Sequence, residues 1–141
     1  MNIVRVMLLS VFLLAGGAAS AADDPVKAVY HLTNGTSEAT RALRNIRNHL
    51  NADPTAKIVV VANDLGIDFL LYDAKAENGS KFTGPIGELS NRGVEFRVCA
   101  NTLESREIAQ DQVVMEATIV PSGVAEAARL QAREKFAYVR P

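Results

Sequence analysis

The chain contains a single cysteine, Cys99, which lies between a short apolar run and a segment with helix-capping residues, in Val94-Glu-Phe-Arg-Val-Cys-Ala-Asn-Thr102. A cysteine just before a helix lies near the positive end of the helix dipole and near unpaired N–H groups, which favour the thiolate and lower its pKa. Free cysteine also packs commonly as a small buried hydrophobe. The position of Cys99 therefore leaves two alternatives open, a reactive thiolate and an inert core residue.

Other groups could assist the thiol, but each also has a plain structural interpretation. His31 could act as a base toward Cys99, although a histidine in a buried strand is more commonly a hydrogen-bonded core residue. Asp64 could orient a ligand or simply occupy a loop. Arg106 could offer its charge to an anionic sulfur species or lie on the surface, and His49 is expected to be solvated.

Composition excludes several classes of function. One cysteine and two histidines cannot complete a four-ligand zinc site, and neither a nucleophile elbow nor a glycine-rich phosphate loop is present, so we expect no metal and no cofactor. The 15 basic and 16 acidic residues are nearly balanced and tryptophan is absent, which argues against a nucleic-acid partner.

The N-terminal residues have the three parts of a secretory signal peptide. Arg5 precedes an apolar run over 6–15, and small residues lead to an A-x-A site that ends at Ala21. We therefore expect a signal peptide over 1–21, with cleavage after Ala22 as the alternative, and one domain over 22–141 with no membrane segment. The mature protein is expected to be periplasmic or secreted, where an exposed free thiol is a liability unless it is used.

Strand and helix patterns alternate along the rest of the chain. The segments expected to form strands are 26–33, 58–62, 94–98, 117–120 and 136–139. The segments expected to form helices run from Thr36 or Ser37 to about 52, from Ile67 to Asn78-Gly79, from about Pro85 to Gly93, from Asn101 or Thr102 to about Gln110, and from Ser122 or Gly123 to about Glu134. This order predicts an α/β fold with a mostly parallel sheet covered by helices on both faces.

In such a sheet the ligand crevice lies beyond the carboxyl ends of the strands. The segments that follow the predicted strands are small or polar, which suits a shallow pocket of amides, hydroxyls and backbone N–H groups with Cys99 on its rim. The candidate ligand-binding residues are Asn34, Asn63, Asp64, Asn101, Thr102, Ser122 and Gly123.

Three segments of the chain resemble the DsrE/DsrF-like family. They are 58–71, which begins Ile-Val-Val-Val-Ala-Asn-Asp-Leu-Gly, then 89–103 around Cys99, and 120–141, which begins Val-Pro-Ser-Gly-Val-Ala-Glu. The resemblance covers essentially the whole predicted mature domain. It implies a three-layer α/β/α sandwich with a five-stranded sheet, and homo-oligomers such as trimers or hexamers.

Characterised members of that family are cytoplasmic sulfur-relay subunits that carry sulfur as a persulfide on a cysteine, which corresponds here to Cys99. Together with the expected signal peptide, the resemblance implies an exported sulfur carrier that is sulfurtransferase-like. We expect it to carry sulfur stoichiometrically rather than by turnover, with a sulfur donor or acceptor protein as a candidate partner. The alternative is a non-catalytic oligomeric module that binds a small ligand or a partner. The two differ in whether Cys99 reacts.

Overall fold

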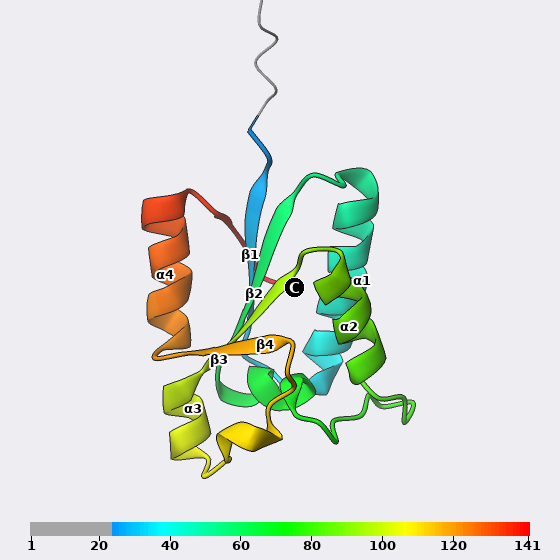
Figure 1. Ribbon diagram of the computed structural model, residues 1–141, viewed down its shortest axis with the longest axis vertical. Helices are drawn as coiled ribbons and strands as arrows, with labels where there is room; N and C mark the ends of the chain where they lie inside the picture. The colour runs from blue at the N-terminus through cyan, green and yellow to red at the C-terminus, as the bar shows by residue number, and fades with distance from the viewer. Residues whose placement is uncertain (1–23) are drawn as a thin grey trace, which may run out of the picture.

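Five parallel strands form the centre of the molecule in the computed structural model, which describes residues 24–141 (Figure 1). The expected signal peptide, 1–21, lies outside these residues. The strands pair in the order β4-β3-β2-β1-β5, and every pairing is parallel. Their bounds are β1 Lys27–Leu32, β2 Lys57–Ala62, β3 Glu95–Cys99, β4 Ala117–Val120 and β5 Ala137–Val139.

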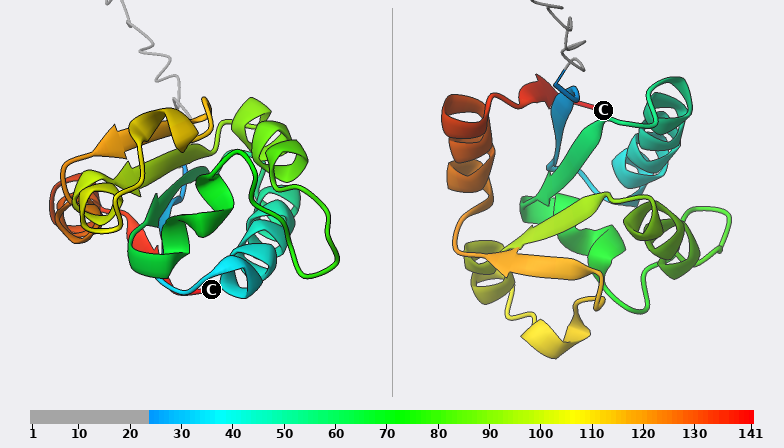
Figure 2. Two further views of the ribbon diagram at one scale, coloured as in Figure 1. Left: turned by 90° about the horizontal axis from the view of Figure 1, so that it is seen from below. Right: turned by 45° about the horizontal axis from the view of Figure 1, so that its top comes forward.

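Helices cover both faces of the sheet, with α1 and α2 on one face and α4 on the other (Figure 2). The helices are α1 Thr36–Ala52, α2 Thr83–Asn91, α3 Ala100–Ser105 and α4 Gly123–Glu134, with 3-10 segments η1 Asp64–Leu70 and η2 Gln110–Gln112. The three-layer α/β/α sandwich and its five-stranded sheet confirm the predicted fold class.

The core is divided by the sheet because side chains of a strand alternate between its faces. Val29, Val59 and Val61 pack against Ala127 and Leu130 on the α4 side. The neighbouring strand residues, such as Tyr30 and Val60, pack in the larger cluster with α1 and α2. The central strand β2 is buried on both faces, as its continuous apolar run predicts.

The prediction of a helix from Ile67 to Asn78-Gly79 is wrong. A short 3-10 segment, η1, ends at Leu70. The backbone then forms hydrogen bonds with a segment distant in sequence, because the Tyr72 N–H donates to the Gln112 carbonyl and the Val114 N–H donates to the Leu70 carbonyl. These bonds replace an i→i−4 ladder. Gly79 has a φ of 80°, within a turn bracketed by the Lys75–Lys81 bridge.

The helix after Cys99 is shorter than the expected segment to Gln110. It begins at Ala100 with Cys99 as its N-cap and has no side-chain cap, so the start predicted at Asn101 or Thr102 is wrong by one or two residues. It ends near Glu107, whose φ is 52°, and the Ile108 N–H turns back to Leu103. That turn lets Ile108 pack against the apolar core, which outweighs helix continuation.

Candidate functional site

The sheet brings Cys99 and Asn63 under the first residue of α4. Cys99 is the last residue of β3, and Asn63 directly follows β2. A Cβ atom built on Gly123 would lie 3.1 Å from the Asn63 Cβ and 3.2 Å from the Cys99 Cβ. Glycine makes this approach possible without a tight contact, so Gly123 lets the N-terminal end of α4 pack directly against Cys99.

The thiol of Cys99 is 4% exposed, yet its surroundings favour the thiolate. Burial alone raises the pKa of Cys99, because it penalises the charged form. The Thr102 hydroxyl and the backbone N–H groups of Gly123, Thr102 and Asn101 favour the charged form of the sulfur, and together they lower the pKa of Cys99 below its ordinary value. The thiol is thus both sheltered and activated.

A chain of polar side chains runs from Asn63 across the sheet. The side-chain oxygen Oδ1 of Asn63 lies 2.5 Å from His31 Nε2, and His31 Nδ1 lies 2.8 Å from the Tyr138 hydroxyl. Asn63 also donates from Nδ2 to Asp64 Oδ2 over 2.8 Å. Because both ring nitrogens of His31 are engaged elsewhere, the structure matches the interpretation of His31 as a hydrogen-bonded residue rather than a base for Cys99.

Asp64 is linked through its backbone to Thr102 and Arg106. Its φ of 52° lies in the left-handed region, which is uncommon for a residue other than glycine. In this conformation its N–H donates to Thr102 Oγ1 over 3.1 Å, and its carbonyl accepts from Arg106 Nη1 over 3.0 Å. Arg106 also donates to Asp68 Oδ1 over 2.7 Å. No sequence pattern predicted this backbone role of Asp64.

The other residues predicted for the site, Ser122, Asn101 and Asn34, differ in how their side chains are placed. Ser122 caps α4, where its hydroxyl accepts the Ala125 N–H. The Asn101 side chain is exposed, and its contact with the sulfur comes from the backbone. Asn34 instead hydrogen-bonds Glu38, a buried carboxylate that also accepts the Thr33 N–H and closes the start of α1. No motif pointed to Glu38.

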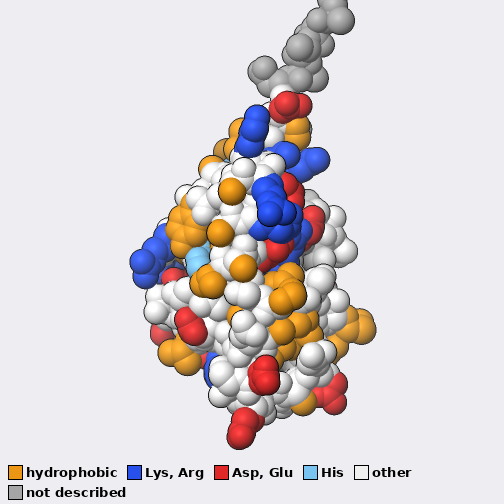
Figure 3. Space-filling view, turned by 90° about the vertical axis from the view of Figure 1, so that its left-hand side faces the viewer, with side chains coloured by type: hydrophobic (Ala, Val, Ile, Leu, Met, Phe, Trp, Pro, Cys, Tyr) orange, Lys and Arg blue, Asp and Glu red, His pale blue; other side chains and the backbone are white. Residues whose placement is uncertain are grey.

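Ion pairs fix α4 on the sheet above the site. Arg97 on β3 pairs with Glu126, which also binds Arg129 at 2.8 Å. These partners, with Arg129 contributing most, hold the pKa of Glu126 below its ordinary value against the effect of burial. In Figure 3, which views the α4 side, basic and acidic side chains lie together on the upper part of this face. The network anchors the helix that begins at Gly123.

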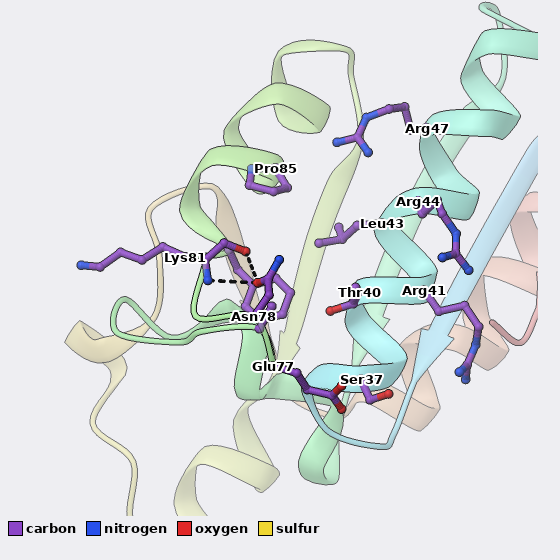
Figure 4. A pocket seen from close by; sticks show the side chains of 13 residues that line it. Ser37, Thr40, Arg41, Leu43, Arg44, Arg47, Glu77, Asn78, Lys81 and Pro85 are labelled. Atoms are coloured by element: carbon purple, nitrogen blue, oxygen red, sulfur yellow. Dashed lines mark hydrogen bonds between the residues drawn. The ribbon is translucent and has the colours of Figure 1, made fainter.

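A separate groove of about 580 Å³ lies between α1 and the segment that leads into α2 (Figure 4). Leu43 and Thr40 point into it, whereas Lys81 points away. Arg47 at one end is held by Glu88 at 2.6 Å. The lining of this groove includes none of the residues around the thiol, namely Cys99, Asn63, Thr102 and Gly123, so the groove is separate from the Cys99 site.

Metal and membrane features can be judged only for the described part of the chain. Within 24–141, no three His, Cys, Asp or Glu side chains are grouped so that they could hold a metal ion. Over the same residues, no helix has the length and apolar character that crossing a bilayer requires.

Comparison with known proteins places this geometry in context. The model of the DsrE/DsrF-like family matches residues 27–139. The structure of MTH1491, a protein of unknown function from Methanobacterium thermoautotrophicum, is similar with a TM-score of 0.73 and 31% identity, over 82% of this chain and 99% of that one. The ychN protein from E. coli shares the fold, with a TM-score of 0.65 and 12% identity over 82% of this chain and 100% of that one. No curated protein matches the chain.

Proposed function

Because the chain belongs to the DsrE/DsrF-like family, which is associated with sulfur relay, we propose that it carries sulfane sulfur as a persulfide on Cys99. The observation that carries the proposal is the environment of the sulfur. A buried cysteine whose pKa is lowered by the Thr102 hydroxyl and by nearby backbone N–H groups is suited to hold an anionic sulfur atom.

The chemistry requires no oxidant when the donor already holds sulfane sulfur. The Cys99 thiolate attacks the terminal sulfur of an inorganic polysulfide and forms a new S–S bond. The S–S bond within the polysulfide breaks, and its electron pair leaves on the shortened chain, which takes up a proton. Transfer to an acceptor thiol reverses these steps, and Cys99 returns to the thiolate.

Intact mass spectrometry tests this proposal. Folded wild-type protein treated with polysulfide should gain one sulfur, about 32 Da, and lose it again on reduction. Cys99→Ser provides the control and should gain nothing. If the folded wild type stays unmodified while the same protein in denaturant gains sulfur, Cys99 is sheltered rather than reactive and the proposal fails.

We also propose that the protein is exported and that its donor is a small inorganic sulfur compound of the periplasm or the medium. The support is the charged start, apolar run and A-x-A site within 1–21. Mass analysis of protein recovered from the periplasm should give a chain that begins at Ala22. A full-length chain retained in the cytoplasm would contradict export.

Self-association is a further proposal, supported by apolar side chains on the surface. Met115 is 86% exposed, and Leu65 and Val124 are more than half exposed on either side of the Cys99 site. Exposed apolar side chains of this kind are typical of interfaces. Light scattering with size exclusion should give an oligomer for the wild type and a smaller species for Met115→Glu. A monomeric wild type would refute this proposal.

The groove beside α1 favours one alternative function, a binding module for a small ligand or a partner. In that case Cys99→Ala should leave binding and assembly unchanged, and persulfide formation should not occur. The polysulfide experiment therefore separates the two functions.

A further inference from the structure

We infer that Arg106 is a positioning residue for the Cys99 sulfur, and that it acts through the backbone of Asp64 and the hydroxyl of Thr102. This inference rests on the proposed function, since it concerns how the same thiol is held ready. It gives a role to an exposed arginine seven positions beyond Cys99 that does not touch the sulfur.

The first link joins Thr102 to both Asp64 and the sulfur. The Thr102 side chain is buried, at 5% exposure, and its Oγ1 accepts the Asp64 N–H over 3.1 Å. A hydroxyl has one hydrogen and two lone pairs, so a donor on one side directs its own hydrogen elsewhere. Thr102 lies in the first turn of α3, three residues after Cys99, and its hydroxyl is the side-chain group that favours the Cys99 thiolate and lowers its pKa.

The second link is the strained backbone of Asp64. With a φ of 52°, its N–H points at Thr102 Oγ1. Such a conformation persists where its surroundings hold it in place. Arg106 supplies that hold, because one Nη1 atom donates to the Asp64 carbonyl at 3.0 Å and to Asp68 Oδ1 at 2.7 Å. The peptide units on both sides of Asp64 are thereby fixed.

Other charged groups surround the thiol, and they decide whether Arg106 acts by position or by charge. The Asp64 carboxylate accepts from Asn63, which lies between it and His31. Glu126 on α4 and Arg97 on β3 neutralise one another. The charge of Arg106 is likewise matched by Asp68, and its hydrogen bond to the Asp64 carbonyl is the direct structural link toward the site.

The experiment measures the thiol pKa by the ultraviolet absorbance of the thiolate, with the Cys99→Ser signal subtracted in each background. This readout does not require a reagent to reach the sulfur. We expect Thr102→Val to raise the thiol pKa, and Arg106→Gln and Arg106→Lys to raise it in the same direction. Arg92→Gln is the matched control, because Arg92 bonds the remote Asn51 and should leave the pKa unchanged.

Non-additivity gives the sharper test. If Arg106 acts through Thr102, then Thr102→Val with Arg106→Gln should shift the pKa no further than Thr102→Val alone. Additive shifts, or a wild-type pKa in Arg106→Lys, would show that Arg106 acts by charge and would overturn the inference. A wild-type pKa in Arg106→Gln would also overturn it. Circular dichroism confirms that each variant is folded.

Failure of the proposed function would be visible separately. If wild type takes up no sulfur from polysulfide while the Arg106 variants shift the thiol pKa, persulfide carriage fails and the positioning role stands. If wild type takes up sulfur while these variants titrate like wild type, only the positioning role fails.

Discussion

Replacement of Gly123 by alanine tests whether the close approach of α4 activates the thiol. The added Cβ would lie 3.1 Å from the Asn63 Cβ and 3.2 Å from the Cys99 Cβ, tighter than ordinary contact between carbon atoms. The start of α4 must therefore move away from β3, or the two side chains must shift. Either movement takes the Gly123 N–H, one of the groups that lower the pKa of Cys99, away from the sulfur, so the thiol pKa should rise.

The cost in stability follows from the same contact. Overpacking a well-filled site by one methyl group costs about 1–3 kcal/mol. With a urea m value of about 2 kcal/mol/M, a loss of about 2 kcal/mol lowers the unfolding midpoint by about 1 M. Urea unfolding followed by circular dichroism measures the midpoint, and thiolate absorbance measures the pKa.

Gly87→Ala is the matched control for this substitution. Gly87 lies within α2, where the nearest atom to an added Cβ is Glu116 Oε1 at 3.9 Å, an ordinary contact. Alanine in a helix interior is favoured over glycine by about 0.5–1 kcal/mol, so this variant should be as stable as wild type or more so. If Gly123→Ala matches Gly87→Ala in midpoint and leaves the thiol pKa unchanged, the reasoning about α4 is refuted.

Three further predictions concern the groups around the site. Gly66→Ala should fail to give stable protein, because its Cβ would lie 2.1 Å from the backbone oxygen of Leu32. Gly84→Ala is the control, because its added Cβ meets nothing within 4 Å. If Gly66→Ala is soluble and unfolds cooperatively near the midpoint of Gly84→Ala, the prediction is contradicted. Glu126 has a folded-state pKa below the ordinary value of 4.5, so its contribution to the free energy of unfolding is present above pH 4.5 and is lost as the pH falls through the folded-state pKa. The stability of Glu126→Gln should therefore depend less on pH in the acid range. Identical acid transitions of the variant and the wild type would count against the ion-pair network. His31→Gln should cost about 1 kcal/mol through its hydrogen bonds, and it should leave the thiol pKa in place, whereas a raised thiol pKa would restore His31 as a partner of the sulfur.

The fold was predictable because its signals are local. The apolar runs of β2 and β4 and the Ser122 cap of α4 specify their elements through periodicity and turn chemistry. The helix expected from Ile67 failed for a non-local reason. Leu70 and Tyr72 bond backbone groups at 112–114, which are far away in the sequence, and periodicity within a window cannot show such partners.

The candidate site was predictable in its place but less so in its contacts. Topology alone brings the polar residues after β2, β3 and β4 to one edge of the sheet. The close approach of Gly123 and the positive φ of Asp64 depend on packing between separate elements. Asn34 follows β1 at the same edge, yet both its side-chain amide and its backbone N–H donate to Glu38 in the first turn of α1, a contact that no local pattern in the sequence predicts.

Burial of Cys99 reconciles the proposed persulfide chemistry with the oxidising surroundings that the proposed export would bring. A disulfide between two copies would have to bring two sulfur atoms to about 2.05 Å, with Cα atoms about 5.5–6 Å apart. A thiol that is 4% exposed, under the first residue of α4, cannot meet that geometry unless the helix moves. A sulfur donor only one or two atoms wide makes no such demand. The packing of Gly123 against Cys99 therefore disfavours a disulfide between two copies more than it disfavours reaction with a small sulfur compound.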